Sequence, residues 1–319
     1  MQSSDTDAED LRSLPDSQWF ERIEEIGQES GYFEWLGASH AAFFVDAGPT
    51  LIVTFETVAG IRRSQPGQLP LGYHVAKGRG WSHLSLIAKS DTWYRDPRVF
   101  AYFDRLVDNA FFESFDQVVF YGAGMAGYAA AAYSVTAPGA TVIAIQPQAT
   151  LDPRIAGWDP RHIDMRRTSF TDRYGYAPDM TEGAGSVFVI FDPEQGLDAM
   201  HAALFARRYT TLLPCRNLGR EIASALDTMR ILPSIIAAAA TGHFDERLFR
   251  IFYRARRNYR PYLRNLLARI DSDGRVPLAA ILCRNVVARL GSKKFAARLA
   301  QLEHELEMTG QSLPPSRRP

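Results

Sequence analysis

A glycine-rich segment, Tyr121-Gly122-Ala123-Gly124-Met125-Ala126-Gly127-Tyr128, has the residue types and spacing that point most directly to chemistry. It follows an apolar run at 117–121 and precedes an alanine-rich helix that we expect to end near residue 136. A glycine-rich turn between a strand and a helix can cradle a phosphate at the helix N-terminus, or it can hold a catalytic side chain in a tight bend. The glycines at 122, 124 and 127 satisfy the spacing G-x-G-x-x-G, which alone does not separate the two possibilities.

The strands around this segment decide against a dinucleotide site. Such a site needs the glycine-rich turn after the first strand of the sheet and an acidic residue at the end of the next strand. Here at least three predicted strands come before the turn, and the next strand ends in Ile145-Gln146-Pro147. The sequence therefore favours a bend that presents a side chain.

The whole stretch from Tyr121 to Ala130 resembles the nucleophile elbow of α/β-hydrolases, especially those that read G-x-S-M-G-G-Y-A-A. In this register Gly122 is the first elbow glycine, Gly124 stands at the position of the serine nucleophile, and Ala126 replaces the second glycine. The resemblance covers about residues 40–230. Its most specific part is Gly122, Met125, Gly127 and the run Tyr128-Ala129-Ala130.

The resemblance also implies where the other two members of a catalytic triad would lie. In these hydrolases the acid follows the strand that corresponds to 186–191 here, which places Asp192 at the acid position. The histidine follows the last strand, where this sequence has Arg220. Glycine has no atom that can attack a carbonyl, and arginine keeps its proton at ordinary pH and cannot act as the base. We therefore expect an incomplete triad, with Gly124, Asp192 and Arg220 at its three positions, and an Arg220–Asp192 ion pair is one hypothesis for the remaining acid.

An alternative keeps catalysis through other residues. His201 comes after Asp192 in the chain, and the pair could activate water or a substrate hydroxyl in the same cleft. The other interpretation of His201 is a hydrogen-bonded helix histidine with a structural role.

Several more residues are candidates for the lining of the cleft. By resemblance, the oxyanion pocket would use the backbone amide of Met125 and a second amide near Thr57 or Val58. Trp93 and Tyr94 follow the predicted strand 83–88, and they either line the same edge or pack in the core. Gln146 and Gln148 follow the predicted strand 141–145 on that edge.

The elements that must position these residues alternate between strands and helices from 41 to 229. Short, nearly all-apolar strands suit a sheet that is buried on both faces, and the alternation with helices indicates right-handed crossovers and mostly parallel strands. The predicted fold is therefore α/β, an α/β-hydrolase-like doubly wound sheet with an all-helical C-terminal extension. The predicted strands are 41–46, 51–57, 83–88, 117–121, 141–145, 186–191 and 210–214, and the predicted helices include 98–109, 197–206 and 220–229.

Charge and periodicity divide the chain further. From His243 onward there are 16 basic and 7 acidic residues, although the whole chain has a net charge of zero. We predict a disordered acidic N-terminus at 1–15, an α/β-hydrolase-like domain at 16–240, a basic helical extension at 244–310 and a disordered tail at 311–319. The Arg-rich helices either present a solvated surface or bind an acidic protein or surface.

Composition excludes several classes of protein. Cys215 and Cys283 are too few for a disulfide framework or a cysteine-rich metal site, and the seven histidines show no ligand spacing, so we expect neither a metal nor a cofactor. The longest apolar stretch, 231–241, is interrupted by Pro233 and is too short to span a bilayer. The N-terminus lacks the pattern of a signal peptide, and we expect a cytoplasmic protein.

The sequence thus favours a catalytically degenerate α/β-hydrolase-like protein that binds a small-molecule, acyl or glycan-like ligand in its cleft, or that acts as a scaffold. Elbows of this sort resemble those of hydrolases associated with acyl transfer and surface-polysaccharide assembly. The alternative is an active hydrolase or acyltransferase that uses His201 and Asp192. Fold alone does not separate these functions.

Overall fold

The computed structural model describes residue 11, residues 14–64 and residues 66–313. The predicted disordered ends, 1–15 and 311–319, fall mostly outside these residues. Leu11, inside the first of them, is buried against the cluster that contains Trp19 and Ile23.

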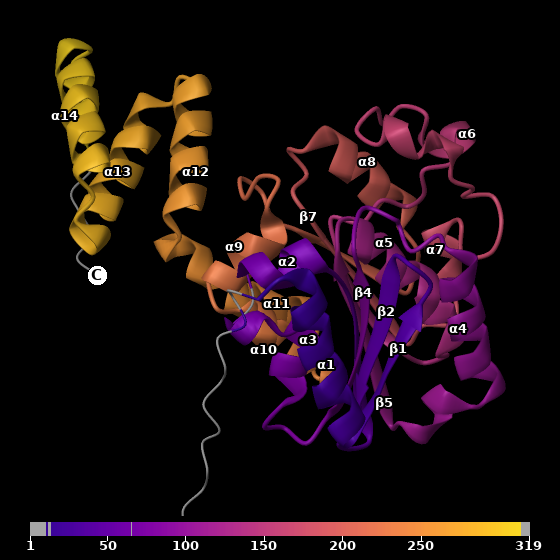
Figure 1. Ribbon diagram of the computed structural model, residues 1–319. Coiled ribbons are helices and arrows are strands. Elements are labelled where there is room, and N and C mark those ends of the chain that lie inside the picture. Colours follow the sequence, from indigo (N-terminus) through magenta and orange to yellow (C-terminus); the bar gives the residue numbers. More distant parts are fainter. Residues whose placement is uncertain (1–10, 12–13, 65, 314–319) are drawn as a thin grey trace, which may run out of the picture.

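An eight-stranded sheet forms the centre of the molecule (Figure 1). Its strand order is β1-β2-β4-β3-β5-β6-β7-β8, and the pairs from β4 through β8 are parallel, whereas β2 runs antiparallel to both β1 and β4. This is the doubly wound, α/β-hydrolase-like architecture that the sequence predicts. The strands are β1 (Gly31–Leu36), β2 (His40–Val45), β3 (Thr50–Thr57), β4 (Ser82–Ala88), β5 (Gln117–Ala123), β6 (Thr141–Ile145), β7 (Ser186–Phe191) and β8 (Thr210–Pro214).

Helices cover both faces of the sheet because its central strands are apolar on both sides. In β5, Phe120 packs on one face with α4 and α5, whereas Val119 and Tyr121 pack on the other face with α3, α9 and α10. The helices are α1 (Asp16–Ser30), α2 (Val58–Ser64), α3 (Leu71–Ala76), α4 (Pro97–Asp108), α5 (Met125–Tyr133), α6 (Pro153–Ala156), α7 (Ala177–Met180), α8 (Gly196–Leu204), α9 (Ile222–Thr228), α10 (Leu232–Ala240), α11 (Glu246–Phe252), α12 (Arg260–Ser272), α13 (Val276–Leu290) and α14 (Lys293–Met308).

The predicted helical extension, 244–310, has two parts in the structure. Phe244, Phe249 and Tyr253 pack in the core on one face of the sheet, together with Phe188 of β7. From α12 onward the helices form a separate core that includes Leu263, Cys283 and Leu302. Figure 1 shows α12, α13 and α14 standing to one side of the α/β body.

Within the described ranges, no single helix has the length and apolar character needed to cross a membrane, and one pair, α9 with α10, would meet those criteria only jointly across a bend of 93°.

Candidate functional site

The turn between β5 and α5 lies at the carboxyl edge of the sheet and has the shape of a nucleophile elbow. Gly124 has φ 58° and ψ −124°, and its amide donates to the carbonyl of Ile145 at 2.8 Å. A Cβ on Gly122 would lie 2.0 Å from the carbonyl oxygen of Ala126, so the strand and helix approach each other closely there. A Cβ on Gly124 would meet no atom within 4 Å. The bend is present and has room for a side chain, but it presents only backbone.

A cavity of about 430 Å³, which we call the cleft cavity, opens over this bend. It is lined by residues that follow the carboxyl ends of β5, β6, β7 and β8, as expected for a ligand site in a doubly wound sheet. Gly124, Gln146, Gln148 and Arg220 are the predicted residues that it brings together.

A second cavity, of about 380 Å³, adjoins the cleft cavity and shares Ala123, Glu221 and Ala223 with it. Two predicted residues, Thr57 and Met125, line this second cavity. Its wall also contains Glu56 and Asp227, and burial raises the pKa of both carboxyls.

Asp192, at the acid position, is fully buried and is bound by backbone amides. Gly219 donates to Oδ2 at 2.8 Å and Glu194 donates to Oδ1 at 3.0 Å, while burial raises the pKa of the carboxyl. The hypothesis of an Arg220–Asp192 ion pair is wrong, since among the described residues the Arg220 side chain contacts only Gln195 Oε1, through Nε at 3.3 Å. The backbone amide of Gly219, and not the guanidinium of Arg220, binds the Asp192 carboxylate.

His201 is fully buried on α8, and both of its ring nitrogens are engaged. Nδ1 accepts from the amide of Ala149 at 3.1 Å, and Nε2 lies 3.0 Å from Asp159 Oδ2. Burial lowers the pKa of His201. Neither ring nitrogen bonds to Asp192, and the side chain is not part of the cavity wall, which fits the structural interpretation of this histidine.

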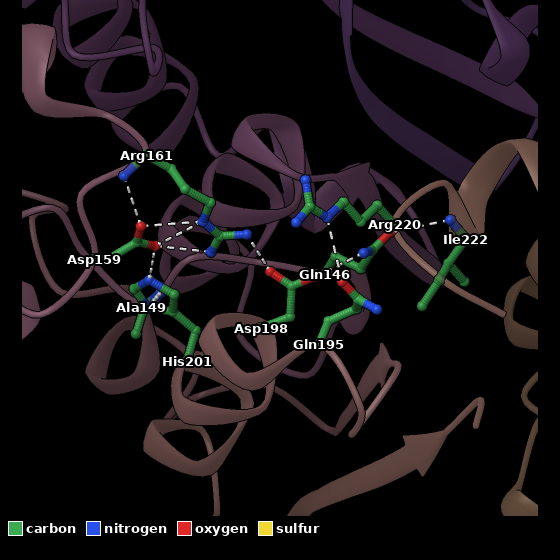
Figure 2. Close-up of polar contacts among 9 residues, drawn as sticks. All are labelled: Gln146, Ala149, Asp159, Arg161, Gln195, Asp198, His201, Arg220 and Ile222. Atoms are coloured by element: carbon green, nitrogen blue, oxygen red, sulfur yellow. Dashed lines mark hydrogen bonds and ion pairs between the residues drawn. The ribbon is translucent and has the colours of Figure 1, made fainter. Parts of the chain in front are cut away.

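A chain of polar contacts joins His201 to the cleft cavity (Figure 2). Arg161 pairs with Asp159 (Nη2 to Oδ2, 2.7 Å) and with Asp198 (Nη1 to Oδ1, 2.5 Å). Gln146 Nε2 donates to the other oxygen of Asp198 at 2.8 Å. The Oε1 atom of Gln146 in turn accepts from the amide of Ile222 at 3.1 Å, at the start of α9. The network ties the long β6–β7 connection to α8 and α9.

Trp93 and Tyr94 pack in the core instead of lining the cleft. Their exposed fractions are 1% and 0%. The Tyr94 hydroxyl donates to the carbonyl of Glu56 at 2.9 Å, and the amide of Trp93 donates to the sulfur of Met125 at 3.1 Å. Of the two interpretations that the sequence left open for these residues, the structure fits packing in the core, and both residues have positive φ.

Most of the lining of the cleft cavity was not predicted, including the polar side chains of Arg161, His162 and Asp198. His162 packs edge-to-face on Trp93, with ring centroids 4.8 Å apart, and burial lowers its pKa. Arg161 and His162 lie in a polar excursion without helical or strand periodicity, so no local signal marked them. No group of three or more His, Cys, Asp or Glu side chains suited to a metal occurs in the parts of the chain that the structure describes.

Comparison with known proteins finds similarity only at the level of the fold. No protein family and no curated protein matches the sequence. Among solved structures, a carboxylesterase, EstE1, from a metagenomic library is similar over 73% of this chain and 99% of its own, with 12% identity and a TM-score of 0.42. An esterase from Pyrobaculum calidifontis has 14% identity over 74% of this chain and 94% of its own, with a TM-score of 0.42. The capsule O-acetyltransferase of Neisseria meningitidis serogroup A has 13% identity over 61% of this chain and 91% of its own, with a TM-score of 0.38.

Proposed function

We propose that this chain is a catalytically degenerate α/β-hydrolase-like protein that binds a small molecule in its cleft without hydrolysing it. The observation that carries the proposal is Gly124, which keeps the backbone of a nucleophile elbow but offers no attacking atom. The acid position adds support, because the Asp192 carboxylate accepts from backbone amides and contacts no imidazole among the described residues. An acyl-transfer or surface-polysaccharide context remains a prediction from the resemblance.

Catalysis through His201 and Asp192 is not favoured by the geometry. A general base must reach the proton that it removes, and both nitrogens of His201 are already occupied away from the cavity. The imidazole that does reach the cleft cavity is His162. Any residual hydrolysis would therefore depend on His162 acting on water.

The first test is hydrolysis of p-nitrophenyl acetate and p-nitrophenyl butyrate at pH 7. We expect no turnover above the buffer rate. Turnover that disappears in His162→Gln or His201→Ala would contradict the proposal and assign the base. Arg216→Gln, on the loop before α9 but outside the cavity wall, is the control for nonspecific effects of mutation.

The second test asks whether the cleft cavity is where ligands bind. Gly196 lines the cavity, and a Cβ added there would meet nothing within 4 Å, so Gly196→Trp should block the cavity without straining the fold. Gly183 has equally open surroundings outside the cavity wall, which makes Gly183→Trp the matched control. Among butyrate, butyramide and p-nitrophenyl butyrate, at least one should raise the melting temperature of the wild type and the control but not of Gly196→Trp. An equal response in all three proteins would contradict binding in this cavity.

A further inference from the structure

We infer that the second cavity binds a small primary ammonium cation, with the Asp227 carboxylate as its counter-charge and the Tyr121 hydroxyl as a hydrogen-bond acceptor. The inference goes beyond the proposed function, because it concerns a site beside the cleft cavity and a positively charged ligand. Binding at this site does not require the cleft cavity to be either active or inactive toward esters.

Tyr121 is the observation that points to a ligand. It is 5% exposed and lines the second cavity, on the face of β5 that packs with α3, α9 and α10. Its hydroxyl makes no hydrogen bond with any residue that the structure describes, and the charged groups that act on it, Glu56 and Asp227, line the same cavity. Buried tyrosine hydroxyls normally have a hydrogen-bond partner, and a ligand in the second cavity would supply the missing one.

The charge of the second cavity favours a cation. Its wall contains four acidic residues and no Lys, Arg or His, and the four are Glu56, Asp91, Glu221 and Asp227. None of them forms an ion pair within the described part of the chain. A carboxylate away from water is unfavourable unless it is paired, and a nearby positive charge favours its ionised form.

Asp227 is the carboxyl that the chain leaves available. It lies in the last turn of α9, where a negative charge meets the negative end of the helix dipole. Its side chain has no hydrogen bond to a described residue, and burial raises its pKa. Glu56 differs, because its Oε1 accepts from Thr54 Oγ1 at 2.7 Å and its Oε2 accepts from the amide of Leu71 at 3.0 Å. We therefore assign the direct contact with the cation to Asp227 and a supporting charge to Glu56.

The remaining walls favour an organic amine over a metal ion. The second cavity is also lined by apolar side chains, those of Phe55, Ile61, Leu71 and Leu232. Its volume of about 380 Å³ is within the usual range for small-molecule sites. Divalent metal ions need several ligands close together, and the described ranges hold no group of three His, Cys, Asp or Glu side chains suited to one. A primary ammonium instead carries three donors on one apolar stem, which matches an acidic cavity with apolar walls.

The test is isothermal titration calorimetry of the full chain with n-butylammonium chloride at pH 7, with sodium chloride holding the ionic strength constant. Butylamine is protonated at this pH, as a lysine side chain is. We expect saturable binding of one butylammonium, and at least tenfold weaker binding of neutral n-butanol and of tetramethylammonium, which has no N–H donor.

Asp227→Asn and Tyr121→Phe should each weaken butylammonium binding about tenfold, the usual effect of losing one hydrogen bond to a charged group. Asp108→Asn is the matched control, because it makes the same change in the last turn of α4, outside the cavity wall, and it should bind as the wild type does. Tyr121→Phe also separates a ligand role from a structural one. Its hydroxyl has no partner among the described residues, so without amine the variant should melt at the wild-type temperature, whereas butylammonium should stabilise it less than the wild type.

Three results would overturn the inference: equal affinity for butylammonium and n-butanol, unchanged butylammonium binding by Asp227→Asn or Tyr121→Phe, or tighter binding of calcium than of butylammonium. Loss of butylammonium binding in Gly196→Trp, which alters only the cleft cavity, would also contradict it. Tyr121→Phe keeps the inference testable if Asp227→Asn does not fold.

Discussion

At the scale of single residues, Gly122 and Gly124 lie two positions apart in one turn but have different structural roles. At Gly122 an added Cβ would collide with the backbone of α5, whereas at Gly124 the space is open and only the positive φ disfavours other residues. Backbone strain of that kind costs about 1–3 kcal/mol. A serine at 124 is therefore sterically possible, and the chain carries glycine there without being forced to by packing.

We expect Gly124→Ser to lower the free energy of unfolding by about 1–2 kcal/mol and to give no esterase activity, because Arg220 and the amide-bound Asp192 supply no base. Gly122→Ala should cost about 3 kcal/mol or more, since its Cβ meets backbone that cannot move aside. Urea unfolding and p-nitrophenyl acetate hydrolysis measure the two effects. Equal destabilisation by both changes, or hydrolysis by Gly124→Ser, would show that this description of the elbow is incorrect.

His83 of β4 is a residue whose burial makes stability depend on pH. It is 1% exposed, neither ring nitrogen has a hydrogen-bond partner among the described residues, and burial, together with the positive charge of His74 when protonated, lowers the pKa of His83 to about 3. Above pH 6.5 neither the folded nor the unfolded chain protonates this ring. Below pH 6.5 the unfolded chain takes up the proton first, so stability falls as the pH decreases from 6.5 toward 3.

The expected contribution of His83 is a slope of up to about 1.4 kcal/mol per pH unit in that window. His83→Leu should show a correspondingly flatter decline when the free energy of unfolding is measured by urea at pH 7, 6, 5 and 4. His40 and His201, whose pKa values burial also lowers, contribute in the same direction in both proteins and cancel in the comparison. Parallel pH profiles for the two proteins would refute the role given to His83.

At the scale of elements, Arg161 connects the β6–β7 excursion to α8. We expect Arg161→Met to lower the free energy of unfolding by roughly 2 kcal/mol, because it leaves Asp198, only 4% exposed, without its charged partner. The loss stays below that of a fully buried pair because the Arg161 side chain is 34% exposed. Thermal and urea unfolding measure the change.

Arg154 provides the matched control, since it also pairs with an aspartate two residues earlier, Asp152, in the same excursion. The Arg154 side chain is 74% exposed, so Arg154→Met should have a much smaller effect. Equal losses in the two variants would mean that the Asp159–Arg161–Asp198 network does not hold the excursion in place.

The sequence predicted the parallel strands and the elbow because those features leave local signals, namely short apolar runs and glycines at fixed spacing. It did not predict β1, an edge strand with one buried residue, Leu36, which is defined by its pairing with β2. It placed Gln146, Gln148 and Arg220 at one edge because residues after parallel strands meet there. The contacts of Arg161 with Asp198 and of Asp192 with Gly219 join residues 37 and 27 positions apart, and only the tertiary fold brings such residues together.

At the scale of the whole molecule, the described helices after Tyr259 have a hydrophobic core of their own and also an excess of basic residues. Residues 260–319 carry 11 basic and 5 acidic residues. Arg260, Arg264, Lys293 and Lys294 surround a groove of about 340 Å³ between α12 and the start of α14. Binding of an acidic protein or surface remains a prediction, and this basic groove is the site at which we would test for it.

The separation between the sheet-side core and the core of α12–α14 predicts where the chain can be truncated. A chain ending at Tyr259 keeps Phe244, Phe249 and Tyr253 on the sheet and loses mainly the separate core of α12–α14. It also loses links to the rest of the chain. These are the Arg269–Glu194 ion pair, the hydrogen bond from Asn265 to the carbonyl of Asn217, the hydrogen bonds from Arg289 to Asn258 Oδ1 and the carbonyl of Arg257, and the packing of Tyr262 on the sheet-side core. We expect it to unfold cooperatively with a free energy of unfolding within about 2 kcal/mol of the full chain.

A chain ending at Gly242 should not fold stably, because it exposes the apolar surface that those three aromatic side chains cover. Their burial contributes about 6 kcal/mol, which is comparable to the whole stability of a typical domain. Circular dichroism and urea unfolding of the two truncated chains make the comparison. Folding of the shorter chain, or failure of the longer one, would mean that the boundary does not lie between η6 (Tyr253–Asn258) and α12, and that α11 belongs with the extension instead of with the sheet.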